Sequence, residues 1–377
     1  MKKLLIMASL FWPQKNSGGP PVSIMNMVTS IRDHFDIYII SKNHEIGDDK
    51  PLPGIKEGWN QFDFGKAYYV PKGQHSFQNI MNLICQVQPD VIYQNSFFSL
   101  DDLLPVLIYK KRNPRVRVIV APRGEFYPER IQRGRLKKHL YAKAFVISGL
   151  LKDVYFQGTG AEECEQEKSL LKIPEDHLLD IQNLAVINKP EGASVEKRPG
   201  MLKLVYIARI HPTKNTLKAI QWLEKVSGQV SFDIYGPIEG EECWKQCLDA
   251  ISKLPPNVQV NYKGMLDHSQ VGEVISQYHG YYMPTTGENF GHSIVESLLV
   301  GRPVIISDQT PWTDVDGIGG FSYPLIQQER FPEAVDRLCA MEQGAYDIIC
   351  DGAKRYIEQK LNTKETIAKY ISAFNGE

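Results

Sequence analysis

The sequence predicts an α/β protein made of two tandem doubly wound domains, each built on a parallel sheet. Short apolar runs alternate with amphipathic stretches along the chain, which is the pattern of β-α-β units. A length of 377 residues is sufficient for two domains. The stretch 188–200 is polar, holds two prolines and two glycines, lacks periodicity and therefore reads as a linker between the two halves.

The first half contains the elements of one such domain. The apolar run 4–10 predicts a first buried strand rather than a signal peptide, because Trp12-Pro13 follows it without a small-residue cleavage site. A glycine-rich loop then precedes a helical pattern over 22–31. We therefore predict a cytoplasmic protein with an N-terminal domain over 1–190. Its later strands are expected at 36–41, 90–93, 116–121 and 153–156.

The second half repeats the pattern and predicts a C-terminal domain over 191–360. In the remaining residues, 361–377, Ile367, Ile371 and Phe374 occur at helical spacing. This spacing predicts a helix that packs on a domain surface, and the N-terminal domain is the candidate for that surface. Parallel sheets bind ligands at the carboxyl ends of their strands, so two facing domains would create a cleft. The strands of this half are expected at 202–208, 231–235, 258–262, 280–283 and 303–307.

Composition excludes several classes of protein. With 43 basic and 44 acidic side chains the formal net charge is -1, so we expect no nucleic acid as partner. No apolar run reaches the roughly 18 residues of a membrane span. The six cysteines are sparse and form no Cys-x-x-Cys pair, which argues against a disulfide scaffold and a cysteine metal site.

The segment 284–307 is the first candidate site. Glu288 and Gly291 lie in a loop after a strand, and a helix is predicted to begin near Ser293. Free amides at a helix start suit an anion, and the carboxylates of Glu288 and Glu296 can accept hydrogen bonds from sugar or ribose hydroxyls. The alternative is that Ser293 and Glu296 form a capping box, in which Glu296 only closes its own helix.

The second candidate site is the loop after strand 202–208. Arg209 and Lys214 lie there, at the predicted carboxyl edge of the second sheet. Two cations at that edge can neutralise a diphosphate; the alternative is a pair of solvated loop cations. Asp314-Val-Asp316 resembles a metal-binding Asp-x-Asp, but we interpret these residues as solvated loop acids. We therefore expect neither a metal nor another cofactor.

Together these segments resemble the retaining nucleotide-sugar glycosyltransferases of the GT-B fold, glycosyltransferase family 4 (glycosyl transferases group 1). The carboxylates of ENFGHSIVE match the family's glutamate motif, and Arg209 with Lys214 matches its diphosphate-binding loop. Gly18-Gly19 matches its glycine-rich first loop. The stretch VGRPVIISDQTPW is similar to the family's sequence after the glutamate helix. The resemblance implies two Rossmann-like domains that face a central cleft, with the acceptor bound by the first and the nucleotide sugar by the second.

The resemblance also implies residue roles. Glu296 would hold the ribose hydroxyls of the donor, and Glu288 would contact the transferred sugar; the latter has also been considered as a nucleophile in the family. Arg209 and Lys214 would stabilise the departing diphosphate. The residues around the helix start and the first loop would complete the donor site: Phe290, Gly291, His292, Ser293, Gly18 and Gly19.

One position departs from the family pattern. Many relatives place a histidine after the strand at 116–121, near the donor sugar, whereas this chain has Arg123. We expect Arg123 and Glu125 to contact acceptor or sugar, because they end a strand where ligands bind. The alternative is a local ion pair between them.

The function implied is retaining transfer of a sugar from a UDP- or GDP-linked donor to a glycan or lipid-linked glycan acceptor in surface polysaccharide biosynthesis. Fixed cations aimed at the leaving diphosphate would supply the main catalytic effect, and the departing phosphate would accept the acceptor's proton. Two other classes remain as alternatives. One is a GT-B-like nucleotide-sugar isomerase or epimerase, and the other is a non-catalytic two-domain sugar-binding protein.

Basic charge is concentrated between residues 105 and 150. This region holds twelve Lys or Arg against two acids, and apolar Leu136 and Leu140 lie among the bases. A basic amphipathic element of this kind can lie on an anionic membrane, whereas the alternative is a solvated helix face. We therefore expect the segment 130–143 to contact an anionic membrane, with the protein peripheral on the inner membrane face.

Overall fold

The computed structural model describes residues 1–14, 18–127, 131–132, 134–185 and 195–377. These residues form two compact units. Unit 1 contains Met1–Leu184 and Thr363–Glu377, and unit 2 contains Ala185–Asn362. Residues 188–194 of the predicted linker lie outside the described part of the chain.

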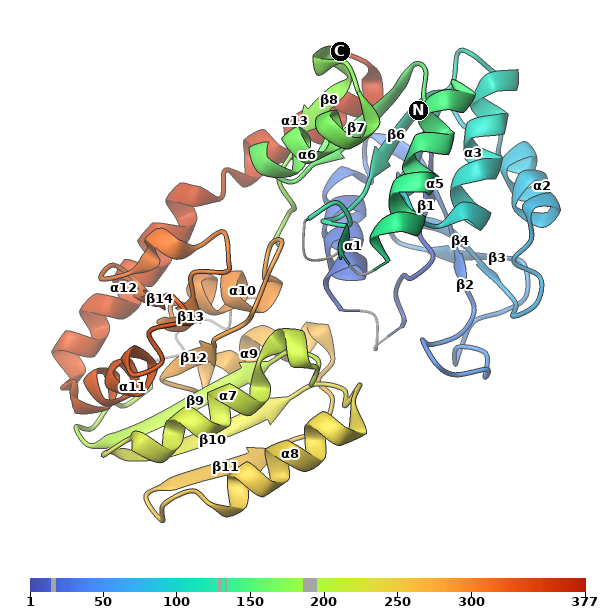
Figure 1. Cartoon of the computed structure of the whole chain (residues 1–377). Coiled ribbons are helices and arrows are strands. Elements are labelled where there is room, and N and C mark those ends of the chain that lie inside the picture. The colour runs from blue at the N-terminus through green and yellow to red at the C-terminus, as the bar shows by residue number, and fades with distance from the viewer. Residues whose placement is uncertain (15–17, 128–130, 133, 186–194) are drawn as a thin grey trace. The chain divides into compact units, whose positions relative to one another are not determined.

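Unit 1 is built on a sheet of eight strands in the order β3-β4-β2-β1-β5-β6-β7-β8 (Figure 1). Neighbouring strands are parallel except for the β3–β4 pair, which is antiparallel. The first strand pairs with both β2 and β5, so the strand order reverses there. The strands are β1 (Lys2–Met7), β2 (Phe35–Lys42), β3 (Trp59–Phe62), β4 (Gly65–Val70), β5 (Val91–Asn95), β6 (Arg117–Ala121), β7 (Val154–Gly158) and β8 (Leu178–Asp180).

Helices cover both faces of this sheet, and side chains of β1 alternate between the two resulting cores. Leu5 and Met7 join a core with residues of α2, α3 and α5, whereas Leu4 and Ile6 join a core with residues of α1 and α13. The helices of unit 1 are α1 (Gly19–Ile31), α2 (Phe77–Val87), α3 (Leu100–Arg112), α5 (Arg135–Ser148), α6 (Ala161–Leu171), the short η1 (Glu175–His177) and α13 (Thr363–Asn375).

The C-terminal helix α13 is part of unit 1. Tyr370 accepts a hydrogen bond from Gln157 Nε2 at 2.9 Å through its hydroxyl. The ring of Phe374 packs edge-on against Phe35 and Tyr93, with centroids 5.7 and 5.4 Å away. The chain therefore crosses to unit 2 and returns to complete the first core.

Unit 2 is built on six parallel strands in the order β11-β10-β9-β12-β13-β14. They are β9 (Met201–Ile207), β10 (Gln229–Tyr235), β11 (Val258–Tyr262), β12 (Gly280–Met283), β13 (Val304–Ser307) and β14 (Gly320–Tyr323). The helices are α7 (Thr216–Trp222), α8 (Glu241–Ser252), α9 (Val271–Ser276), α10 (His292–Val300), α11 (Arg330–Ala340) and α12 (Gln343–Lys360), with η2 (Pro212–Lys214), η3 (Leu223–Lys225), η4 (His268–Gln270) and η5 (Thr313–Val315).

The strand order of unit 2 reverses between β9 and β12, which are neighbours in the sheet. Loops that leave such a switch point diverge to opposite faces and form the usual ligand crevice of an open α/β sheet. Both predicted motifs of this half, the cation loop and the glutamate loop, follow these two strands. The predicted fold class, two α/β domains with parallel sheets, is confirmed. Among the helices that the structure describes, none is long and apolar enough to cross a membrane.

Candidate active site

The loops after β9 and β12 are joined by hydrogen bonds. The carbonyl oxygen of Thr213 accepts from Thr285 Oγ1 at 3.1 Å and from the amide and hydroxyl of Thr286 at 3.0 and 2.9 Å. Asn215 Nδ2 donates to the carbonyl of Pro284 at 2.8 Å. These bonds fix the cation loop against the glutamate loop at the carboxyl edge of the sheet.

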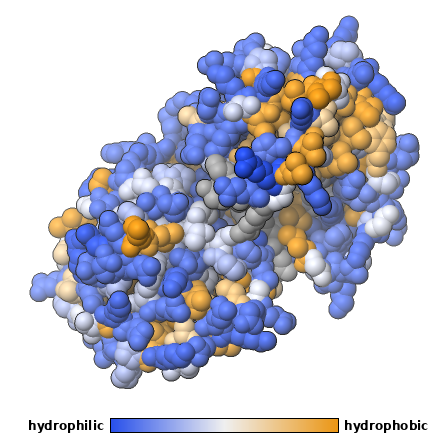
Figure 2. Space-filling view, viewed as in Figure 1, coloured by the Kyte–Doolittle hydropathy of each residue, from blue (hydrophilic) through white to orange (hydrophobic). Residues whose placement is uncertain are grey.

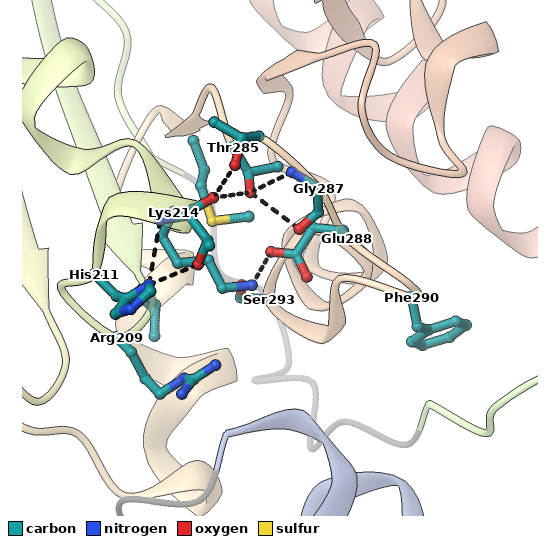
Figure 3. A network of polar contacts seen from close by, with 12 residues as sticks. Arg209, His211, Lys214, Thr285, Gly287, Glu288, Phe290 and Ser293 are labelled. Carbon is teal, nitrogen blue, oxygen red and sulfur yellow. Dashed lines mark hydrogen bonds and ion pairs between the residues drawn. The ribbon is translucent and has the colours of Figure 1, made fainter. Parts of the chain in front are cut away.

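Lys214 and Glu288 meet across these two loops. The Nζ of Lys214, at the end of η2, donates to Glu288 Oε1. Their side chains are only 16% and 12% exposed, so the pair is shielded from bulk water. The backbone amide of Glu288 donates to Gln309 O at 2.9 Å, which anchors the loop on its other side. Figure 3 shows Lys214 and Glu288 directed toward each other.

Arg209 follows the end of β9 and pairs with Glu239, a partner that the sequence did not predict. Its Nη1 donates to both carboxylate oxygens of Glu239, at 3.0 and 2.9 Å. The two side chains are 36% and 25% exposed, so the pair lies at the rim of the site. Glu239 follows β10 and was missed because it belongs to no motif. Its position after a strand, at the edge where Arg209 was expected, was the available signal.

The start of α10 depends on Gly291. This residue is the N-cap, with φ of 72°, and an added Cβ would lie 3.1 Å from Ile294 Cδ1. A glycine is therefore required there. The first helical bonds run from the amides of Ile294 and Val295 to the Gly291 carbonyl. The amides of residues 291–293 thus precede the helical ladder, as a helix N-terminus that binds an anion requires.

The capping-box alternative is wrong. No side chain caps α10. The Ser293 hydroxyl instead shares a hydrogen bond of 2.7 Å with the Tyr281 hydroxyl, and Glu296 is bonded to His268. Glu296 is therefore not used to close its own helix.

Glu296 and His268 form the second ion pair around α10. His268 Nε2 lies 2.7 Å from Glu296 Oε1. The Glu296 side chain is 4% exposed and that of His268 is 41% exposed. Desolvation lowers the pKa of His268, but the hydrogen bond and negative charge of Glu296 outweigh it, so that this pKa is raised above its ordinary value. Sequence reasoning missed His268, which precedes α9 in a segment without a recognisable motif.

The side chain of Phe290 packs in the hydrophobic core of unit 2. It is buried, and its ring lies 5.5 Å from that of Trp312 and 4.8 Å from that of His292. The Trp312 indole N–H donates to the Phe290 carbonyl. In Figure 3 the ring points away from Lys214 and Glu288. The donor contacts predicted for Phe290 and His292 would be made by their backbone amides, and these contacts stay predictions.

Gly18 and Gly19 lie in unit 1, at the start of α1. Gly18 is the N-cap, with φ of 70°, and Gly19 begins the helix, followed by two prolines in its first turn. The helix therefore starts three residues before the predicted position 22, since proline is well tolerated in a first helical turn. Their role toward a donor stays a prediction.

Arg123 is an interior residue of unit 1. Its guanidinium donates to Asn95 Oδ1 at 3.1 Å, to the Tyr93 hydroxyl at 2.9 Å and to Asn183 Oδ1. The residue is 8% exposed and has φ of 56°. These contacts tie the ends of β5 and β6 to the segment that leaves unit 1. A direct contact with acceptor or sugar, as predicted, would require this network to open.

Glu125 does not pair with Arg123, so the ion-pair alternative is wrong. Its carboxylate accepts from Ser96 Oγ at 2.5 Å and from the amides of Phe97 and Phe98 at 2.7 and 3.3 Å. Desolvation raises the pKa of Glu125 despite these bonds. Its contacts hold the loop after β5, and a role in acceptor binding stays a prediction.

The two acids of the Asp-x-Asp stretch are engaged by protein groups. Asp314 pairs with Lys360 and accepts from the Tyr356 hydroxyl. Asp316 Oδ1 accepts from the Ser322 amide at 3.2 Å. Within the described ranges, no group of three or more His, Cys, Asp or Glu is arranged to hold a metal ion. Both residues are exposed, as expected of solvated loop acids, and their contacts hold the surrounding loop of unit 2.

This architecture is the GT-B fold. HepE of Anabaena, solved in complex with UDP and glucose, superposes over all of both chains with a TM-score of 0.74 at 13% identity. WaaG, a glycosyltransferase involved in lipopolysaccharide biosynthesis, gives 0.68 at 12% identity over 99% of this chain and all of WaaG. Sucrose-phosphate synthase of Thermosynechococcus elongatus gives 0.72 at 11% identity over all of this chain and 99% of that one.

Within this fold, residues 190–349 match the model of the family described as Glycosyl transferases group 1. That range holds Arg209, Lys214, Glu288 and Glu296, all on unit 2. A curated relative from Streptococcus agalactiae, the GtfA subunit of a UDP-N-acetylglucosamine–peptide N-acetylglucosaminyltransferase, is 34% identical over 95 residues. That match spans 23% of this chain and 18% of the relative.

Proposed function

We propose that this protein is a retaining, metal-independent glycosyltransferase that uses a UDP- or GDP-linked sugar as donor. The observation that carries the proposal is the meeting of Lys214 with Glu288 at the start of α10, inside a glycosyl transferases group 1 domain. A cation, a carboxylate and helix amides converge there, and they suit a diphosphate and a sugar hydroxyl. The structures of HepE in complex with UDP and glucose, and with UDP-glucose, support a nucleotide sugar as donor.

The proposed reaction breaks the bond between the anomeric carbon and the diphosphate oxygen, and the electron pair leaves with the diphosphate. Lys214, Arg209 and the α10 amides stabilise that charge as it develops. The acceptor oxygen then bonds to the anomeric carbon from the same face, and its proton passes to the departing phosphate. Glu288 orients the sugar and keeps Lys214 in place. Because fixed cations supply the charge stabilisation, this scheme needs no metal ion.

The proposed acceptor is a glycan or lipid-linked glycan of surface polysaccharide biosynthesis, reached from the inner membrane face. Support comes from α5, whose packed side is formed by Ala142 and Phe145. On the opposite side Leu136, Leu140 and Ile147 are 74%, 58% and 74% exposed. Their spacing of four and seven residues places them on one stripe of the helix.

Exposed basic side chains flank this stripe, among them Lys137 and Lys143, and α5 contains no acid. Figure 2 shows apolar side chains beside hydrophilic ones on the part of unit 1 that carries α5. An apolar stripe with basic flanks suits the surface of an anionic bilayer. Of the predicted basic segment, Arg130 and Arg133 lie outside the described residues, and Lys138 Nζ lies 5.1 Å from the centre of the Phe98 ring.

The activity is tested by thermal shift with a panel of nucleotide sugars, followed by incubation of the stabilising donor with and without candidate acceptors. We expect the sugar to appear on an acceptor, and NMR to show the same anomeric configuration as in the donor. A new nucleotide sugar formed without acceptor would identify an isomerase or epimerase. Inverted configuration in the product would contradict the retaining mechanism.

Membrane contact is tested separately by flotation with phosphatidylglycerol-containing and pure phosphatidylcholine vesicles. We expect recovery on the anionic vesicles only, and its loss when Leu136, Leu140 and Ile147 are all replaced by Ser. Ile326→Ser is the matched control, because Ile326 is 87% exposed but lies on unit 2. Equal recovery on both kinds of vesicle, or no effect of the triple change, would contradict a membrane-binding role of α5.

A further inference from the structure

We infer that His268 is a positioning residue for the donor: it holds the carboxylate of Glu296 in the orientation that accepts hydrogen bonds from the ribose. This inference rests on the proposed function, in which Glu296 binds that ribose. His268 belongs to η4, whereas Glu296 lies in α10, so the contact joins two separate segments of unit 2.

The burial of Glu296 makes its partner important. The residue is 3% exposed, and an ionised carboxylate so far from water requires compensation by hydrogen bonds or opposite charge. Among the residues that the structure describes, His268 Nε2 is the donor to this carboxylate. The other candidate use of Glu296, closure of its own helix, is excluded by the geometry of α10.

The contact with His268 also leaves capacity for a ligand. A carboxylate offers about four acceptor positions on its two oxygens, and His268 occupies one, on Oε1. The remaining positions suit a pair of adjacent hydroxyls, such as the 2′ and 3′ hydroxyls of a ribose. A carboxylate held by one fixed donor loses less rotational freedom when it binds these hydroxyls, which favours affinity.

The location of His268 distinguishes it from the groups proposed to act on the diphosphate. Lys214 and Arg209 follow β9 and act on the leaving charge, so their loss should lower turnover. His268 contacts only Glu296 among these site residues. Its loss should therefore weaken binding of the nucleotide and leave turnover at saturating donor nearly unchanged.

The test is calorimetric titration of the full-length protein with UDP, GDP and their 2′-deoxy analogues. We expect His268→Ala to weaken binding of the preferred nucleotide by about tenfold, as for loss of one hydrogen bond to a charged group. His268→Gln, which keeps a neutral donor, should recover part of this loss. Gln270→Ala on the same short helix is the matched control and should bind as the wild type does.

The analogues separate positioning from general stabilisation. In the wild type, loss of the 2′ hydroxyl should weaken binding by about tenfold. In His268→Ala the penalty should be much smaller, because Glu296 is no longer held toward that hydroxyl. A merely structural role would lower the melting temperature without changing this discrimination.

The two failures can be told apart. If the wild type binds neither UDP nor GDP, the proposed donor class is wrong and the inference on His268 falls with it. If the wild type binds one of them and His268→Ala binds it equally well, or keeps the full 2′-hydroxyl discrimination, the inference on His268 alone is wrong.

Discussion

Lys214 and Glu288 form an ion pair although 74 residues separate them in the chain. The pair exists because β9 and β12 are neighbours at the point where the strand order of unit 2 reverses. Hydrogen bonds from Thr285 and Thr286 to the Thr213 carbonyl then hold the two loops together. A cation loop and a glutamate loop that are distant in sequence thereby become one site.

Replacement of Lys214 or Arg209 by Ala should lower turnover far more than donor affinity. The charge of both side chains matters most when the diphosphate departs, and loss of one such group costs about a hundredfold or more in kcat. Steady-state kinetics measure this effect. Lys218→Ala is the control, since Lys218 is an exposed lysine of α7 one turn beyond Lys214. Near wild-type kcat in both site variants would contradict the assigned role.

Glu239→Gln should tighten binding of UDP or GDP by about threefold to tenfold, because it removes a negative charge beside the proposed phosphate site and releases Arg209. The pair is partly exposed, so its contribution to stability is only about 0–1 kcal/mol and the melting temperature should hardly change. Titration calorimetry compares this variant with Glu242→Gln on α8. Weaker binding would show instead that Glu239 positions Arg209 for the ligand.

The His268–Glu296 pair should make stability depend on pH. The pKa of His268 is raised in the folded protein, so the stabilisation is fully present below its ordinary value of 6.5 and is lost as the pH rises through the folded value. Because the His268 side chain is 41% exposed, solvent screening keeps the effect below about 1 kcal/mol.

Denaturant unfolding from about pH 6 to about pH 8.5 measures this dependence. The wild type should be more stable than His268→Gln at the acidic end, and the difference should shrink toward the alkaline end. A difference that is constant across this range would mean that the charge of His268 contributes nothing to the pair.

Phe374→Ala should destabilise unit 1. The side chain is 1% exposed and packs against Phe35, Tyr93 and Tyr370, and truncation of such a phenylalanine costs about 3–5 kcal/mol. Hydrogen exchange should become faster in β1 and β5 and stay unchanged in β9 and β10. Unchanged exchange in β1 would mean that α13 is not needed for the first core.

Much of the fold could be predicted from the sequence, because buried parallel strands are continuous apolar runs. The strand predicted at 258–262 and that at 280–283 match β11 and β12 residue for residue. Of the strands that were missed, β3, β8 and β14 lie at sheet edges, whereas β4 lies between β3 and β2. WNQF in β3 has two polar residues, and LLD in β8 is three residues long, too short for a recognisable period.

The site could be predicted only where residues belong to motifs. Lys214 and Glu288 were assigned to one donor site because both belong to motifs of the family that the sequence resembles. Glu239 and His268 are single charged or titratable residues in loops, and only the folded chain shows that they face Arg209 and Glu296. Arg123 is buried because its guanidinium bonds to Asn95 and Tyr93 on the neighbouring strand β5, and no local pattern of residues reveals these long-range contacts.

The most direct test is a crystal structure of the protein with UDP or GDP bound. We expect the diphosphate within hydrogen-bonding distance of Lys214 Nζ, the Arg209 guanidinium and the amides at the start of α10, with the ribose hydroxyls on the carboxylate of Glu296. A nucleotide bound away from these groups, or one whose diphosphate contacts neither cation, would contradict the account.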